Sequence, residues 1–235
     1  IGRGKGFRSM IGLLFTFYSI IFFMIPFIYR GYSPIILSII VSIISTIVTL
    51  FLLNGWSKKT IVATLATCVG VIISGVIFCL ISNLLNISGF NLDEAESLIL
   101  IAQNTGLKIR DILFSGILIS SLGAVMDVAM SIASSIYEIN ELNSELDMKT
   151  IFKSGINIGR DMIGTMSNTL ILAFAGTSLS TMLALYSYNT QFNQLMSSDF
   201  IAIEFAQSIS GSIGIILAVP ITSFISSYVY KRKIR

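Results

Sequence analysis

Residues 112–137 read ILFSGILISSLGAVMDVAMSIASSIY and contain one charged side chain, Asp127. A helix of about 20 apolar residues is long enough to cross the hydrocarbon core of a bilayer. The run is continuous and lacks the alternation of apolar and polar residues found in the strands of outer-membrane barrels. This stretch therefore predicts a transmembrane helix with a single acid near its middle.

The rest of the chain has the same character, because 54% of its 235 residues are hydrophobic, 11% are charged and its mean hydropathy is +0.87. A soluble domain carries roughly a quarter charged residues, and a disordered chain needs low hydrophobicity and high charge. A net charge of +3 is too small for nucleic-acid binding. With no His and two Cys, the usual ligands and nucleophiles are missing. We therefore expect an all-α, polytopic membrane protein that is not an enzyme and has no metal or cofactor.

Six uncharged or nearly uncharged stretches are long enough to span a bilayer. They form one transmembrane domain with expected spans at residues 10–28, 34–53, 60–85, 112–137, 162–186 and 200–230.

The basic residues predict the orientation of these spans, since short cytoplasmic connections are rich in Lys and Arg. With the N-terminus inside, 12 of the 15 basic residues fall on the cytoplasmic side. Only Arg30, Lys108 and Arg110 fall outside. Both termini are therefore predicted to be cytoplasmic.

Two connections are predicted to be more than turns. Asn91 and Glu94 have the spacing of a helix N-cap and its return partner, and Gly106 is a typical terminator. They predict a short interfacial helix at about 92–105 on the outside. On the inside, residues 138–161 mix charged and apolar side chains and predict an amphipathic connecting helix. A plain solvated connector is the alternative for each.

Asp127 is the most informative residue, because an acid at the centre of a membrane helix costs on the order of 3 kcal/mol on insertion scales. At about 100° per residue, small and polar residues share an arc of roughly 80° with it. They are Gly116, Ser120, Gly123, Ser131, Ser134 and Glu138. Hydroxyls can hydrogen-bond a carboxyl group in either protonation state. The stripe is thus either a proton-relay face or a helix-packing seam.

The fifth expected span begins with Arg160 and Asp161 and continues through Thr165 and Asn168. The first two, with Glu138, are expected at the cytoplasmic mouth, where they pair with one another or with lipid headgroups. An amide buried as deep as Asn168 needs partners. We expect it to approach Asp127, with Thr165 beside it.

In the sixth span, Glu204, Ser208, Gly211, Ala218 and Thr222 recur on one face. Glu204 is either an outer proton-entry acid or an interfacial carboxylate that reaches water. Because spans four to six all carry small and polar stripes, the polar centre of the fold is expected among them.

The residues of spans four to six resemble the YibE/F family of bacterial membrane proteins. The resemblance rests on GAVMDVAMSIASSIYE at 123–138, GRDMIGTMSNTL at 159–170, AFAGTS at 173–178, and GSIG at 211–214 with AVPIT at 218–222. Sequences of the YibE type often have two adjacent acids and a His in these motifs. Here Met126 precedes a single Asp127 and Met162 follows Asp161, so the chain is more similar to the YibF-type member. The resemblance implies location in the bacterial inner membrane and little about biochemical role.

A more distant resemblance is to the six-helix half of RND transporters and of the SecD/SecF export proteins, whose fourth helix carries a proton-relay acid. Only residues 31–33 separate the first two spans here, where those families insert a large domain. This similarity therefore concerns the scaffold rather than the cargo.

Three functions are compatible with these observations. The first is a transporter or a proton-motive-force-coupled subunit of an export complex, in which Asp127 is the relay and Asn168, Thr165 and Glu204 gate it. It implies a second copy or a YibE-like sister subunit, because six helices make one half of a pseudo-symmetric transporter. The second is a non-transporting scaffold whose stripes are packing seams. The third, an intramembrane hydrolase using Asp127 with Asp161, requires carboxyls close enough to share a proton.

Overall fold

A computed structural model describes residues 3–85, 106–187, 193–194 and 197–231. The regular elements of this part are all helical, which confirms the predicted all-α class. They are α1 (Arg3–Tyr18), a π-helical segment η1 (Ser19–Met24), α2 (Ile25–Tyr29), α3 (Pro34–Asn54), α4 (Lys58–Leu84), α6 (Ile109–Leu142), α7 (Met148–Thr177), α8 (Leu179–Ser187) and α10 (Asp199–Lys231).

Five helical segments are long and apolar enough to cross a membrane. They are Gly6–Tyr29, which joins α1, η1 and α2, and then Pro34–Asn54, Lys58–Leu84, Ile109–Leu142 and Phe200–Tyr230. These five match the predicted first, second, third, fourth and sixth spans. The expected fifth span is divided between α7 and α8, which meet at Ser178. The count of six spans therefore stays a prediction.

Local sequence signals explain where the central helices begin and end. Pro34 occupies the first turn of α3, and Gly55 ends that helix with φ +66°. The Ser57 hydroxyl accepts a hydrogen bond from the Thr60 N–H at 3.3 Å and starts α4. The Asp147 carboxylate likewise accepts from the Thr150 N–H at 3.2 Å and starts α7. Hydrogen bonds from Thr150 lower the pKa of Asp147, which keeps this cap ionised.

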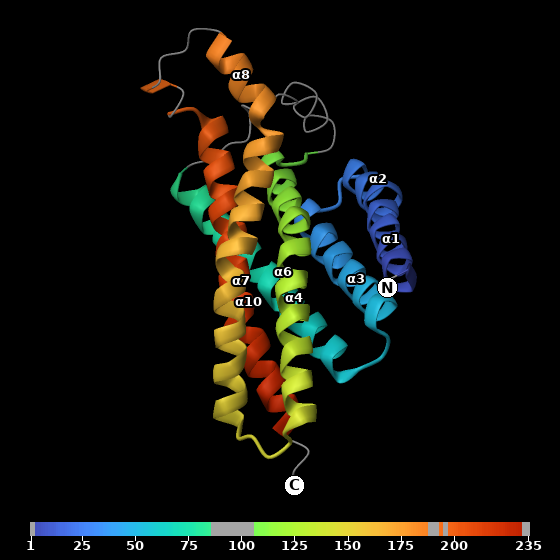
Figure 1. Cartoon of the computed structure of the whole chain (residues 1–235). Coiled ribbons are helices and arrows are strands. Elements are labelled where there is room, and N and C mark those ends of the chain that lie inside the picture. The colour runs from blue at the N-terminus through green and yellow to red at the C-terminus, as the bar shows by residue number, and fades with distance from the viewer. Residues whose placement is uncertain (1–2, 86–105, 188–192, 195–196, 232–235) are drawn as a thin grey trace.

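The helices alternate in direction, so that α3, α6 and α10 descend and α1, α4 and α7 ascend in Figure 1. The connections 55–57 and 143–147 lie at the end of the bundle where α10 finishes. Lys58, Lys59, Lys149 and Lys231 belong to this same end. The predicted charge asymmetry therefore has a structural counterpart, while the orientation in the membrane stays a prediction.

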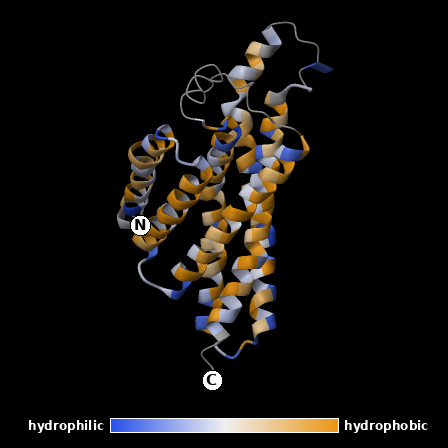
Figure 2. Ribbon diagram, turned by 180° about the vertical axis from the view of Figure 1, so that it is seen from behind, coloured by the Kyte–Doolittle hydropathy of each residue, from blue (hydrophilic) through white to orange (hydrophobic). Residues whose placement is uncertain are grey.

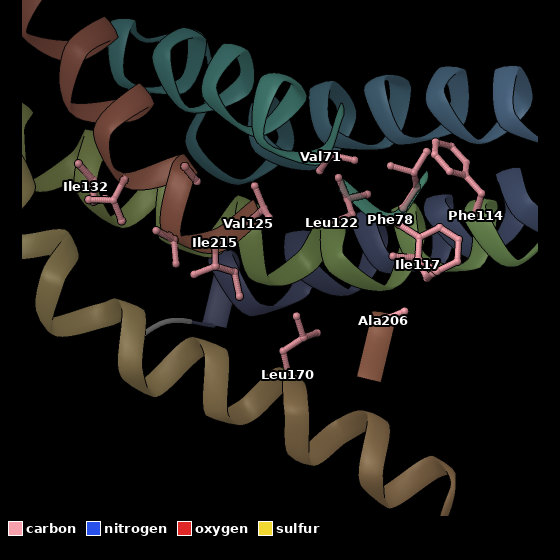
Figure 3. Packing of buried hydrophobic residues seen from close by; sticks show 14 of the residues in the cluster. Val71, Phe78, Phe114, Ile117, Leu122, Val125, Ile132, Leu170, Ala206 and Ile215 are labelled. Atoms are coloured by element: carbon pink, nitrogen blue, oxygen red, sulfur yellow. The ribbon is translucent and has the colours of Figure 1, made fainter. Parts of the chain in front are cut away.

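The core lies where α4, α6, α7 and α10 pack together. Figure 3 shows Val125 and Ile132 of α6, Leu170 of α7 and Ile215 of α10 directed into one apolar cluster. By contrast, α1 packs mainly against α3 and exposes large side chains such as Leu13 and Phe17, more than half of whose surface is accessible. Apolar colour continues around the outer faces of the helices in Figure 2, as expected of surfaces in contact with lipid.

The two predicted connections have different outcomes. The outer helix expected at 92–105 lies outside the described residues. The inner stretch 138–161 is helical at both ends but is not a separate element, because α6 continues to Leu142 and α7 begins at Met148. Ile151 of this stretch is fully buried and Ile156 is packed against the core. The apolar side of the stretch therefore belongs to the bundle itself.

Candidate functional site

The open face of α6 consists of the predicted stripe. Gly116, Ser120, Gly123, Asp127 and Glu138 are all exposed. The opposite side of the same helix is buried. It carries Ile117, Val125, Val128, Ile132 and Ile136, none of which exposes any surface. The period of 3.6 residues thus separates one apolar face, held by α4 and α10, from one small and polar face that is largely open and whose Ser120 and Gly123 border a hollow shared with α1 and α3.

Asp127 lies midway along the bundle. On its own helix, Val125 is packed against Gly70 of α4, and Ile132 against Gly159 of α7. Gly159 also lies against Val219 of α10, so Asp127 is level with the middle of α10. Among the described residues, Asp127 has no hydrogen-bond or ion-pair partner. The acid is therefore exposed at the depth where a bilayer is most apolar.

A hollow of about 390 Å³ lies beside this face, between α1, α3 and α6. Its walls include Ser9 and Thr16 of α1, Thr49 of α3, and Ser120 and Gly123 of α6. Gly123 lies one turn from Asp127 on the same face. Hydroxyl groups from three helices thus line a space next to the acid.

Asn168 and Thr165 lie on the outer side of α7, away from the core. Both are exposed on α7, whose inner side carries Gly159 and Leu170 against the core. Within the described chain, neither side chain forms a hydrogen bond with Asp127. Asn168 is about half a turn from Gly159 around the helix axis and points away from the bundle. One copy of the protein does not bring these residues to the acid.

The three residues expected at the cytoplasmic mouth lie at two depths. Glu138 is in the last turns of α6, near the connection 143–147. Arg160 and Asp161 directly follow Gly159, which lies against Val219, about 18 Å along α10 from Lys231. Both are exposed. These neighbouring Arg and Asp residues therefore lie on the outer side of α7, well away from the end of the bundle.

Glu204 lines a separate hollow of about 430 Å³ between α7, α8 and α10. Its carboxyl group lies near Ser178, whose hydroxyl donates a hydrogen bond to the Phe174 carbonyl oxygen at 2.9 Å. Its Oε2 is buried and has no partner among the described residues. Glu204 is about 16 Å along α10 from Ile215, which is near the level of Asp127. The two acids are therefore in different places, and Glu204 does not contact the open face of α6.

The packing seams inside the chain include glycines that the sequence interpretation passed over. Gly155 lies against Ser223 and Ile136, one turn before Gly159, and Gly214 lies against Ser74 of α4. The sequence did carry a signal for the first pair, because Gly155 and Gly159 have the G-x-x-x-G spacing of close helix contacts.

The predicted packing residues divide in the same way. Gly211 lies against Leu170 and Ser121. A methyl group added at Gly116 or Gly123 would instead have no atom of the described chain within 4 Å. Of these three glycines, only Gly211 is therefore part of a packing seam within one chain.

Comparison with known proteins supports one family. The family model described as YibE/F-like protein matches residues 1–232, nearly the whole chain. No curated protein and no solved structure matches the chain.

Proposed function

We propose that this chain, which belongs to the YibE/F-like family, is a transporter or a proton-motive-force-coupled subunit of an export complex rather than an enzyme. It is an integral protein of the bacterial cytoplasmic membrane, with both termini in the cytoplasm. Asp127 is its proton-relay residue. The single observation that carries this proposal is an exposed carboxyl group at mid-bundle depth on a face of small and hydroxyl residues.

The physical reason is the cost of such an acid. A charged aspartate facing lipid at this depth is unfavourable by about 3 kcal/mol. Such an aspartate is tolerated when it contacts water or a partner chain, or when it is protonated. Ser120 on the same face, about 10 Å along the helix, and the hydroxyl-lined hollow beside Gly123 make the surroundings of the acid polar. Proton exchange at Asp127 then changes the charge on this face, which provides a coupling step.

The assembly around Asp127 requires another chain, either a second copy or a YibE-like sister subunit. The stripe on α6 is open, and Asn168 and Thr165, the residues expected to serve the acid, are exposed on the outside of α7. They reach an Asp127 carboxyl group only from a neighbouring subunit. Glu204 belongs to a different hollow and gates proton entry from the outer side.

Proton flux in liposomes tests the relay. Purified protein is reconstituted with a pH-sensitive dye inside, and a pH step is applied. We expect Asp127→Asn to reduce the protein-dependent flux at least tenfold, because an amide does not exchange its proton in this range. The matched control is Asp111→Asn, the same substitution in the first turn of the same helix, and it should retain the flux. Unchanged flux in Asp127→Asn would remove the proposal.

A non-transporting scaffold is the second candidate, and the open glycines favour it. Nothing lies within 4 Å of the position that a side chain would take at Gly116 or Gly123, which suits close approach of another helix. Under this function neither wild type nor Asp127→Asn carries protein-dependent flux, while both form the same complex in the membrane.

A further inference from the structure

The geometry points to a head-to-tail interface between two copies of this chain, in which the open face of α6 in one copy packs against the outer face of α7 in the next. We define the α6 face by Gly123, Asp127 and Glu138, and the α7 face by Lys153, Arg160, Gly164 and Asn168. All seven residues are exposed. The second copy is chosen because the two faces have opposite charges at matching depths.

The two faces are distinct surfaces of their own helices. On α7, the inner side is marked by Gly155, Gly159 and Leu170. At about 100° per residue, the α7 face lies within an arc of roughly 80° centred about 140° away from that inner side. The α6 face lies similarly opposite Val125 and Ile132. The α7 face is open, and the α6 face borders the hollow shared with α1 and α3, so a neighbour can reach both faces without disturbing the core.

Three internal contacts fix the relative height of α6 and α7. Ile136 lies at Gly155, and Ile132 lies at Gly159. Farther along the same pair of helices, Ser121 and Leu170 meet at Gly211 of α10. The stretch 121–132 thus runs beside the stretch 159–170. The two antiparallel helices keep one register over this whole distance.

That register sets the depth of every residue on the two faces. Asp127 is level with Gly164, Gly123 with Asn168, and Glu138 with Lys153. A rotation about the membrane normal leaves depth unchanged, so these pairs stay level when they come from different copies. Asp127 of one copy would then meet the gap at Gly164 of the next, with Arg160 one turn below and Asn168 one turn above.

The charges favour this pairing over the symmetric one. The acids Asp127 and Glu138 lie on the α6 face and the bases Lys153 and Arg160 on the α7 face. None of the four has an ion-pair partner among the described residues. A two-fold dimer through either face would place like charges at the same depth opposite one another. Asp161 lies at the edge of the α7 face, about 20° from Asn168 and 100° from Arg160, and offsets part of the positive charge of that face.

Small residues make close approach possible. A methyl group added at Gly123 or Gly164 would have nothing within 4 Å in the single chain. In membranes, where lipid tails are as apolar as the helices, association depends on such close packing and on interhelical hydrogen bonds. The interface does not rest on proton coupling, since the copies can pair whether or not Asp127 relays protons.

Disulfide cross-linking between differently tagged copies tests the interface. In full-length protein with Cys68→Ala and Cys79→Ala, one copy carries Gly123→Cys and the other Asn168→Cys, and both are expressed together and oxidised in native membranes. We expect a cross-linked dimer that carries both tags. The control pairs Gly123→Cys with Ile72→Cys, an exposed residue of α4 two positions from Gly70 and so at a similar depth, and should yield at least tenfold less dimer.

Charge reversal provides a second measurement. Glu138→Lys and Lys153→Glu should each lower the yield of the Gly123→Cys and Asn168→Cys dimer several-fold, and the two together in one chain should restore it. The proposal is overturned if Gly123→Cys copies cross-link to each other as efficiently, or if Asn168→Cys forms a product only with an untagged protein. It is also overturned if no dimer forms while the tagged copies are present in the membrane. Proton flux is measured separately on the same variants, so that failure of the interface and failure of the proton relay can be told apart.

Discussion

The glycines of the helices divide into two groups that differ in what surrounds them. At Gly159 and Gly214 an added methyl group would collide with Val219 and with Ser74, respectively. At Gly123 and Gly164 the same methyl group would meet nothing within 4 Å. Both kinds occur on α7, where Gly159 and Gly164 are five residues apart and face in different directions.

The difference shows how one chain uses the same residue for two purposes. The inner glycines bring α7 and α10 close enough for Val219 and Ile132 to fill the space where side chains would be. The outer glycines leave space that no part of the described chain fills. In a bilayer, close helix contact through small residues is a main source of association. The outer group is therefore the surface on which the single chain is incomplete.

The largest expected effect separates the two groups on one helix. Gly159→Leu should destabilise the protein by about 3 kcal/mol, because overpacking forces Val219 and Ile132 out of their positions. Gly164→Leu should change stability by no more than about 0.5 kcal/mol in dissociating detergent. Unfolding can be followed by a thiol-reactive dye, since Cys68 and Cys79 are both half-buried on α4.

Equal destabilisation by the two leucines would contradict the division. It would mean that the space beside Gly164 is filled within a single chain. Loss of stability at Gly164 only in mild detergent, where copies stay associated, would instead agree with an intermolecular role for that face.

A smaller effect identifies which neighbouring side chain excludes a methyl group at position 159. A methyl group at position 159 meets both γ carbons of Val219 first and Cδ1 of Ile132 at 3.0 Å. Val219→Ala removes both γ carbons. We therefore expect the double variant Gly159→Ala with Val219→Ala to be more stable than additivity predicts, by about 1–2 kcal/mol. A double-mutant cycle of unfolding measurements gives this coupling, and a value near zero would place the limiting contact elsewhere.

The sequence predicted those parts of the fold that depend on local signals. The second span was expected at 34–53 and is found at Pro34–Asn54, because Pro34 and Gly55 mark its ends. The stripe around Asp127 was likewise predicted as one face, because helical periodicity alone determines which residues share it.

The sequence could not show how the helices are turned toward one another. On α7, Gly155 and Gly159 form one small-residue face, and Gly164 with Asn168 forms another. Periodicity identifies both but not which one meets α6. The expectation that Asn168 faces Asp127 in the same chain assumed that the Gly164 and Asn168 face turns inward. The contacts with Ile132, Ile136 and Val219 show that the Gly155 and Gly159 face does so. Packing between distant segments decides this, and it also carries α7 as one helix through Arg160 and Asp161.

The smallest effect is expected at Gly123, and its size distinguishes a packing seam from an empty surface. Gly123→Ala adds a methyl group into open space, and alanine is the better helix former by up to about 1 kcal/mol. Stability of the dissociated chain should therefore stay the same or rise slightly. The same methyl group would separate two copies that meet at this position, so the yield of membrane-embedded complex should fall. Both quantities are measured on one preparation: stability by thiol reactivity, and the yield of complex by light scattering under native conditions. A stability gain with an undiminished complex would show that α6 approaches no partner here, and that Asp127 faces lipid or water instead.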